Sequence, residues 1–564
     1  MVPMASAIRR RFLILCNPAT GQINPLTALM EELVQRGHQV ILSSSSHILK
    51  KAQKLQLRVG QIPQPEEIPS DEYLAKNQVV FYSLGSSEVM EDYTNKAMEH
   101  PERFQKMCRS APGDIWGWLD TFTELVPGAS SEYRDVVFFI RDLVEALDPD
   151  MIIVDNFSPF AVDGVRLTKR PFIETSPGAA AAVASNVNIF SSPIPMSGAR
   201  TGSGDMFVLF RNFIFMLIWL KFIFFNPWPA RRRQFRKEVL GLPSTDIICD
   251  SIMTPTPGML PQQVATISFN VAGMDVYPAE AYDKSVYFVG PCFPPKQIST
   301  PAKSLPSSPN VNPTPLDFSP SVSVASTPTI GETMLEKEMF SMQTLTRDYD
   351  PVMAWLDRAH LDGKRVLYIN MGSIFYYTRK DYDSIVQALK MLHDMYPNTM
   401  VLWKIPKLPF EVQPLPTPDE DRLPLYIRRE DWLPSVESVL SHPAVAVCMH
   451  HGGGNSYNEA LAYGVPQFCV SQWVDTHDIG LCIQNSGVGL WAEKSPFFDP
   501  SDMSTKLAQL LEDQNNKFRN TALSWKLKAS QAGGTKSAAD IIEGVVSSYQ
   551  FANGSSKTPM LNAI

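Results

Sequence analysis

Residues 431–480 read DWLPSVESVLSHPAVAVCMHHGGGNSYNEALAYGVPQFCVSQWVDTHDIG. The apolar run Val445–Met449 is typical of a buried strand, and it ends in two histidines and three glycines before a helical pattern begins. Glycine lets a backbone approach a ligand closely, and a helix N-terminus offers unpaired N–H groups to an anion. The side chains of His451, Asn455 and Ser456 add hydrogen-bond donors, and Glu459, one turn further on, can accept hydrogen bonds from a ribose diol. This stretch therefore predicts a site for a phosphorylated ligand.

Strand and helix patterns alternate on both sides of a proline-rich segment. Apolar runs suited to buried strands precede that segment at Phe12–Cys16, Val40–Leu42 and Met151–Val154, and follow it at Val366–Ile369, Val401–Trp403, Val445–Met449 and Phe468–Val470. Two such blocks predict an α/β protein with two Rossmann-like parallel-sheet domains that face a cleft. We expect an N-terminal domain over 1–290 and a C-terminal domain over 346–500.

The segment between the two blocks has a different composition. The chain has 46 Pro in 564 residues, and residues 291–328 hold ten Pro and eight Ser. A segment with so few large apolar residues cannot bury enough surface to fold, so we expect a disordered interdomain insert over 291–345. Residues 501–564 begin as a helix, and we expect a helix at about 536–549 to cross back to the N-terminal domain, followed by a disordered tail.

The net charge and the cysteine content limit which partners the protein can bind and in which cellular compartment it is expected. The formal net charge of −8 argues against nucleic-acid binding over the whole surface. Seven Cys without C-x-x-C spacing argue against a disulfide framework or a zinc site, and no histidine pair has metal-ligand spacing. The first apolar run is only five residues long, too short for a secretory signal. We therefore expect a cytoplasmic protein without a metal, which can also touch a membrane surface.

That membrane contact would involve residues 206–237. The run MFVLFRNFIFMLIWLKFIFF (206–225) is long enough to span a bilayer, but it lies inside the first α/β block, and ARRRQFRK (230–237) follows it. Spanning would put two halves of one sheet on opposite sides of a membrane. One interpretation is an interfacial helix with a basic flank, in peripheral contact with lipid. The other is a helix of the core or of a substrate pocket.

The stretch 431–480 resembles the donor-binding box of the UDP-dependent glycosyltransferase superfamily (family 1 type, GT-B fold), as found in fungal or plant enzymes acting on secondary metabolites and sterols. Four further motifs resemble family motifs in the same order: TGQINP (20–25), DNF (155–157), FVGP (288–291) and VLYINMGS (366–373). Within the box the matching residues are Trp432, Pro434, His442, Pro443, Val445, His451, Gly453, Asn455, Ser456, Glu459, Gly464, Val465, Pro466 and Asp475.

The resemblance implies roles for individual residues. Trp432 would stack on the uracil, and Glu459 would bind the ribose. His451, Asn455 and Ser456 would hold the pyrophosphate beside Ser373. The remaining donor-site residues expected from the motif are Gly453, Gly454, Asp475 and Thr476, with Asp475 bonded to the sugar. The implied activity is transfer of a hexose from a UDP-sugar, as co-substrate, to a hydroxyl or carboxyl group of a lipophilic small molecule with inversion.

The sequence departs from the family where the base is expected. The family's histidine after the first-turn glycine is Gln22 here, and an amide does not titrate near neutral pH. Gln22 can position an acceptor, and Asp155 is then the nearby carboxylate from the motif. Asp155 acts directly, or the acceptor is acidic enough to need little help, or the protein binds a nucleotide sugar or lipid without catalysis. A nicotinamide-dependent dehydrogenase is disfavoured because no strand is followed by G-x-G-x-x-G.

Two further departures affect the sugar end of the site. The family's Asp-Gln pair is Asp475-Thr476, so glucose cannot be assumed as the donor sugar. The family's tryptophan in the G-W-N-S run is Gly454, which leaves more room near the sugar.

Overall fold

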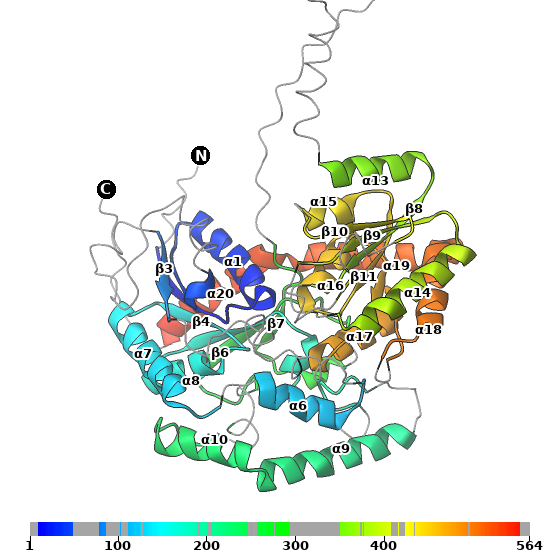
Figure 1. Ribbon diagram of the computed structural model, residues 1–564. Helices are drawn as coiled ribbons and strands as arrows, with labels where there is room; N and C mark the ends of the chain where they lie inside the picture. Colours follow the sequence, from blue (N-terminus) through cyan, green and yellow to red (C-terminus); the bar gives the residue numbers. More distant parts are fainter. Residues whose placement is uncertain are drawn as a thin grey trace, which may run out of the picture.

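The structure is a computed structural model, and two parallel sheets lie side by side in it (Figure 1). It describes residues 9–48, 78–85, 102, 111–125, 128–188, 192–199, 206–245, 247, 250, 256–275, 277–293, 350–372, 375, 377–407, 415–416, 423–433, 435–494 and 497–552. Apart from residues 291–293, the expected insert over 291–345 lies outside the described residues, as does the expected tail after residue 552.

The first sheet has seven strands in the order β3-β2-β1-β4-β5-β6-β7, all paired in parallel. The strands are β1 (Arg11–Leu15), β2 (Gln39–Ser44), β3 (Val79–Ser83), β4 (Met151–Asp155), β5 (Phe172–Ser176), β6 (Gln263–Ser268) and β7 (Val286–Phe288). Phe12 and Ile14 of β1 face one apolar core with the first and last helices, whereas Leu13 and Leu15 face a second core on the other side. Cover on both faces explains the uninterrupted apolar runs in the sequence.

The second sheet has six strands in the order β10-β9-β8-β11-β12-β13, also parallel. Its strands are β8 (Arg365–Asn370), β9 (Thr399–Lys404), β10 (Ile427–Glu430), β11 (Val445–His450), β12 (Gln467–Cys469) and β13 (Gly489–Trp491). The predicted α/β class with two parallel sheets is confirmed.

Helices cover both sheets. Those of the first half are α1 (Thr20–Gln35), α6 (Ile115–Leu125), α7 (Ser131–Leu147), α8 (Pro159–Thr168), α9 (Met206–Phe225) and α10 (Pro227–Glu238). Those of the second half are α13 (Pro351–Leu361), α14 (Arg379–Met395), α15 (Val436–Ser441), α16 (Gly454–Tyr463), α17 (Val474–Ser486), α18 (Pro500–Glu512), α19 (Lys517–Ala532) and α20 (Gly534–Ala552). Among the described residues, no single helix is long and apolar enough to cross a bilayer. Helices α9 and α10 reach the necessary length and hydropathy only together, as a pair bent by 55°.

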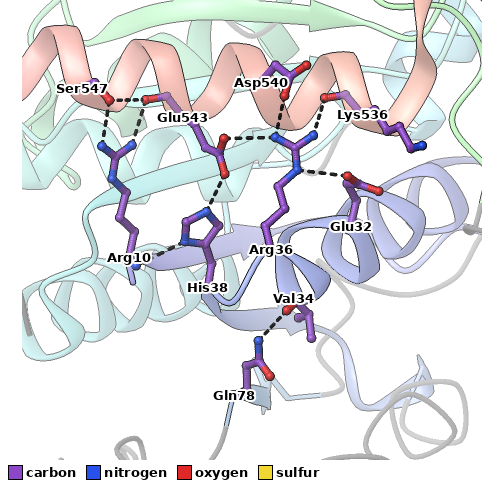
Figure 2. A network of polar contacts seen from close by, with 10 residues as sticks. All are labelled: Arg10, Glu32, Val34, Arg36, His38, Gln78, Lys536, Asp540, Glu543 and Ser547. Atoms are coloured by element: carbon purple, nitrogen blue, oxygen red, sulfur yellow. Dashed lines mark hydrogen bonds and ion pairs between the residues drawn. The ribbon is translucent and has the colours of Figure 1, made fainter. Parts of the chain in front are cut away.

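The last helix, α20, packs against α1 and so ties the end of the chain to the first sheet (Figure 2). Ala538, Ile542 and Val546 of α20 are fully buried in the first core. Polar contacts surround this apolar seam: Nη1 of Arg36 lies 2.6 Å from Asp540 and 3.0 Å from Glu543, and Nε2 of His38 lies 2.7 Å from Glu543. The two halves of the molecule are therefore joined by α20 as well as by the chain between them.

Candidate donor and acceptor site

The loop between β11 and α16 is built around two buried histidines with different roles. His450 accepts a hydrogen bond on Nδ1 from the Gly452 N–H (3.1 Å), and its Nε2 lies 2.8 Å from the side-chain oxygen of Gln467. Burial lowers the pKa of His450 to about 4, so its ring is neutral and fixes the shape of the loop. His451 is 5% exposed, and its Nδ1 has no hydrogen-bond partner among the described residues. Burial also lowers the pKa of His451, to about 3, so it offers a neutral ring to a ligand.

Glycines make the space that the His451 ring occupies. A Cβ on Gly372 would lie 2.6 Å from Cε1 of His451, and a Cβ on Gly453 would lie 2.4 Å from its Nε2. Gly372 has a φ of 77°, a conformation that favours glycine. The end of β8 and the start of α16 thus converge on this ring. Ser373, the next residue after Gly372 and an expected pyrophosphate contact, lies outside the described residues.

The N-terminus of α16 has no side-chain cap. Its N-cap residue is Gly453, so no side chain satisfies the first N–H groups of the helix, as Ser or Asp would. Ser456 lies in the first turn and is 8% exposed. Nδ2 of Asn455 donates to the backbone oxygen of Thr20, 3.2 Å away at the start of α1. This helix end therefore has free N–H groups next to His451, and it also touches the first half of the molecule.

A second part of the site combines the carboxyl ends of β9 and β10 with α16. Lys404 ends β9, Trp432 follows β10, and Glu459 lies within α16. The Trp432 side chain is 72% exposed, and Nζ of Lys404 lies 4.6 Å from the centre of its ring. Burial raises the pKa of Glu459 to about 7, and the positive charge of Lys404 partly opposes this rise. An exposed indole ring is a suitable stacking surface for a base. Lys404 connects the two residues, because its ammonium group lies over the Trp432 ring and its charge acts on Glu459. Sequence reasoning missed Lys404, although it directly follows the predicted strand Val401–Trp403.

The start of α17 holds the two residues expected at the sugar. The Asp475 carboxyl faces the segment 177–178 of the first half, with Oδ2 3.9 Å from the position of a Cβ on Gly178. Burial raises its pKa to about 6. Thr476 is 1% exposed, and its hydroxyl accepts from the N–H groups of Gln472 and Trp473 and donates to the Trp473 oxygen. These bonds use the hydrogen-bonding capacity of the Thr476 hydroxyl within the helix start, so that hydroxyl is not available to a ligand in this conformation.

One turn further along α17, Asp478 joins the two halves of the molecule. Its Oδ2 accepts from the Met196 N–H at 2.6 Å, and its Oδ1 accepts from the Gly198 N–H at 2.7 Å. Met196 has a φ of 67°, unusual for a side chain with a Cβ, and the two bonds to Asp478 help to hold this backbone. Asp478 could not be identified from the sequence, because its partners lie about 280 residues earlier.

On the opposite side of the site, Gln22 and Asp155 lie at the carboxyl edge of the first sheet. Helix α1 begins at Thr20, because the Ala19 oxygen accepts hydrogen bonds from the N–H groups of Gln22 and Ile23. Gln22 is thus in the first helical turn. Its Oε1 is buried without a hydrogen-bond partner in the described ranges.

Asp155 ends β4 and is fully buried. Its Oδ2 accepts from the Asn17 N–H (3.3 Å) and the Ser158 hydroxyl (2.9 Å), whereas its Oδ1 has no partner within the described part of the chain. Burial raises the pKa of Asp155 to about 7. A carboxyl group that titrates near neutral pH and has a free oxygen can exchange a proton, but access to it requires movement of its cover.

A metal centre is not suggested by these residues: across the described ranges, no group of three or more His, Cys, Asp or Glu side chains is arranged to hold an ion. The site instead offers N–H groups, a neutral imidazole, an exposed indole and carboxyl groups of raised pKa. Such a set suits a phosphorylated and hydroxylated ligand.

Comparison with known proteins adds sequence relatives. Residues 411–543 match the family model described as erythromycin biosynthesis protein CIII-like, C-terminal domain. Erythritol-mannosyl-transferase 1 of Pseudozyma antarctica (strain T-34) is 27% identical over 605 aligned positions, covering 94% of this chain and 90% of that protein. UDP glycosyltransferase 9 of Catharanthus roseus is 28% identical over 194 positions, 32% of this chain and 37% of that protein.

Solved structures show the same architecture. The glycotransferase of kitacinnamycin superposes with a TM-score of 0.59 at 15% identity, covering 95% of this chain and 99% of that one. CalG4, the calicheamicin glycosyltransferase, superposes with a TM-score of 0.53, also at 15% identity, covering 96% of this chain and 98% of that one. At this identity the likeness concerns the fold.

Proposed function

Because this chain is a glycosyltransferase of the family 1 type with the GT-B fold, we propose that it transfers a hexose from UDP to a hydroxyl of a lipophilic small molecule. The observation that carries the donor half of this proposal is the N-terminus of α16, which has no side-chain cap and lies beside the His451 ring. Two glycines leave room for that ring, and its buried Nδ1 has no hydrogen-bond partner among the described residues. A diphosphate fits there because it accepts hydrogen bonds from N–H groups and is favoured by the positive end of a helix.

For the rest of the donor, the roles are those that the motif resemblance implies. The base stacks on Trp432, the ribose hydroxyls bond to Glu459, and the hexose hydroxyls bond to Asp475. Asn455 and Ser456 bond to the pyrophosphate beside Gly453 and Gly454. As the leaving diphosphate gains negative charge, the N–H groups of α16 stabilise it, which lowers the barrier to departure.

At the acceptor side, Gln22 binds the attacking hydroxyl and Asp155 receives its proton. The hydroxyl oxygen forms a bond to the anomeric carbon, the bond from that carbon to the phosphate oxygen breaks, and the configuration inverts. Asp155 suits the proton role because its pKa of about 7 and its free Oδ1 allow it to be ionised before the reaction and protonated after it. Gln22 lies in the first turn of α1, and its buried Oε1 has no hydrogen-bond partner among the described residues, so it can accept a bond from the hydroxyl.

We expect a lipophilic acceptor because α9, a largely apolar helix, belongs to the acceptor half of the molecule. A second candidate is transfer of mannose to a small polyol. It is favoured by the relatives named erythritol-mannosyl-transferase 1, which align over 94% of the chain and thus over the acceptor half.

The experiment is a product screen by intact mass. The full chain is incubated with UDP-glucose, UDP-galactose, UDP-N-acetylglucosamine or a nucleoside diphosphate mannose, each with a lipophilic alcohol library or with erythritol. We expect a hexose adduct on a lipophilic alcohol from a UDP-sugar, and none with a Trp432→Ala, Glu459→Gln double variant. A mannose adduct on erythritol alone would favour the second candidate, and UDP binding without any adduct would contradict both.

A further inference from the structure

Helix α9 is apolar except for Arg211, Asn212 and Lys221, yet its buried side chains in the described part of the chain lie on one side. Of its 20 residues, MFVLFRNFIFMLIWLKFIFF, the side facing the core includes Phe215, Phe222 and Ile223, which are at most 9% exposed. Trp118 of α6 packs edge-on against Phe215 and Trp219 of this side, with ring centres 5.3 and 6.1 Å apart. This side is part of a shared core, so α9 cannot leave the protein to cross a bilayer without exposing it.

The other side of α9 is open and still apolar. Phe213 and Phe210 are each 61% exposed and Phe225 is 82% exposed. The exposed large apolar side chains of this outer face are Leu209, Phe210, Phe213, Ile214, Leu217, Leu220, Phe224 and Phe225. Figure 1 shows α9 and α10 along the lower margin of the molecule, away from both sheets. A helix that is apolar on all sides is normally buried on all sides, so this outer face requires a cover.

The charges around the outer face are positive, although fewer than the sequence suggested. Arg211 and Lys221 of α9 and Arg231 and Lys237 of α10 are exposed, and the one acidic residue of the two helices is Glu238, at the end of α10. The expected basic flank 230–237 is only partly available.

The unavailable part of that flank is buried inside the protein. Nε of Arg236 lies 2.9 Å from Oδ2 of the fully buried Asp163, and the Arg232 guanidinium lies 5.5 Å from the centre of the Tyr133 ring. These two arginines fix α10 to α7 and α8 and do not reach outward. The expectation of a continuous basic flank is thus corrected, because the packing of α10 turns two of its arginines inward.

We propose that the outer face of α9 lies flat on an anionic bilayer surface, with its aromatic and leucine side chains at the level of the acyl-chain boundary and its cations at the head groups. The proposed function enters this inference at one point: a lipophilic acceptor would give the protein a reason to contact a membrane. A second copy of the chain is a poorer cover, because it would bring the same exposed cations into apposition.

A small cavity supports a link between this face and the acceptor side of the site. Its lining includes Ile115, Ser197, Ala199 and Phe215 together with Arg211 and Ile214, which also belong to the exposed side of α9, and so it lies between α6, α9 and the segment 196–199. Asp478 of α17 holds that same segment by its backbone. An acceptor that enters from the lipid side would therefore arrive next to the helix that carries Asp475.

The test is sedimentation of the full chain with vesicles, without any donor. We expect binding to phosphatidylcholine vesicles that contain about one third phosphatidylserine, and weaker binding to phosphatidylcholine alone or at high salt. A Phe213→Glu, Leu217→Glu variant should reduce the partition coefficient on the mixed vesicles by about tenfold or more, since each change removes an apolar side chain from the contact. The matched control is Leu361→Glu, Leu425→Glu, which adds the same two charges at two exposed leucines outside α9, one on α13 and one before β10.

Three results would overturn the inference: no binding of the parent to either vesicle, equal binding of the Phe213→Glu, Leu217→Glu variant, or a dimer in light scattering that this variant dissociates. Failure of the proposed function has a different signature. If vesicles bind but no donor and acceptor pair gives a product, the sugar transfer is wrong and the bilayer contact stands. If transfer to an acceptor dissolved in detergent proceeds without vesicle binding, only the bilayer contact is wrong.

Discussion

Replacing Asp155 with asparagine separates the proposed proton acceptor from an ordinary structural residue. Asparagine keeps a carbonyl oxygen that can accept from the Asn17 N–H and the Ser158 hydroxyl, the two bonds that Oδ2 makes. What it removes is the ability to carry a negative charge and to take a proton. We therefore expect Asp155→Asn to lose activity and, at alkaline pH, to be more stable than the parent.

The size of the stability gain follows from the pKa of Asp155, which burial raises from 3.8 to about 7. A carboxyl group with a raised folded-state pKa stabilises the protein below its unfolded pKa, and this contribution is lost as the pH rises through the folded-state pKa. The loss occurs between about pH 4 and about pH 7. A difference of about three pKa units at 1.36 kcal/mol each gives an upper bound of roughly 4 kcal/mol at pH 8. Asparagine has no such loss, and it also relieves Glu174, whose pKa the Asp155 charge helps to raise.

The assay is thermal unfolding of parent and variant from pH 4 to pH 8, together with turnover on the best donor and acceptor pair. The melting temperatures should nearly coincide at pH 4, and the variant should melt several degrees higher at pH 8, while turnover falls by about 10² or more. The matched control is Asp163→Asn, since Asp163 is also fully buried but is paired with Arg236 and should lose stability when neutralised.

Two results would refute this reasoning. If Asp155→Asn is less stable than the parent at pH 8, the carboxylate is an ionised cap at the end of β4 and its charge is useful to the fold. If the variant keeps full turnover, the acceptor loses its proton without Asp155.

Three further variants address the donor site, the contact between the two halves and the last helix. Trp432→Ala should weaken UDP binding by about 1–3 kcal/mol in calorimetry but leave the melting temperature of the free protein unchanged, because the ring is 72% exposed. Asp478→Ala should lower the melting temperature and raise the acceptor KM more than the donor KM, since the bonds to the Met196 and Gly198 N–H groups are lost; equal changes in both would contradict its role at 196–198. Arg36→Ala should free α20 for cleavage by a protease, at a cost of about 1–2 kcal/mol that shrinks at high salt, and protection equal to the parent's would show that the apolar seam suffices.

The sequence predicted those parts of the molecule whose signal is local. Buried strands such as Val445–His450 are visible as apolar runs, because a parallel sheet covered on both faces needs apolar residues throughout. The loop from His451 to Ser456 is visible for the same reason, since its residues are contiguous. The site's cross-contacts are not local. Asp478 and Lys404 contact residues that lie far away along the chain, so their roles cannot be read from neighbouring residues. Periodicity also does not show that the Thr476 hydroxyl is hydrogen-bonded within its own helix start.

The orientation of α10 could not be predicted from the sequence either. The basic run after α9 reads as one charged surface, but a helix turns by about 100° per residue, so neighbouring arginines point to different sides. Arg231 is exposed while Arg232 is 2% exposed. Only the packing of α10 on Tyr133 and Asp163 decides which of these charges reach solvent.

The structure adds a second reason for the three glycines of the loop, Gly452, Gly453 and Gly454. Read from the sequence, they allow a ligand to approach. In the structure each is also required by protein: a Cβ on Gly452 would lie 2.7 Å from the Thr476 oxygen, and one on Gly454 would lie 2.3 Å from the Pro177 oxygen. Gly454, where the resembling family has tryptophan, thus lets the first half of the molecule touch the start of α16. The Pro177 backbone lies where a side chain at position 454 would begin, so any larger residue there would push the first half of the molecule away from the start of α16.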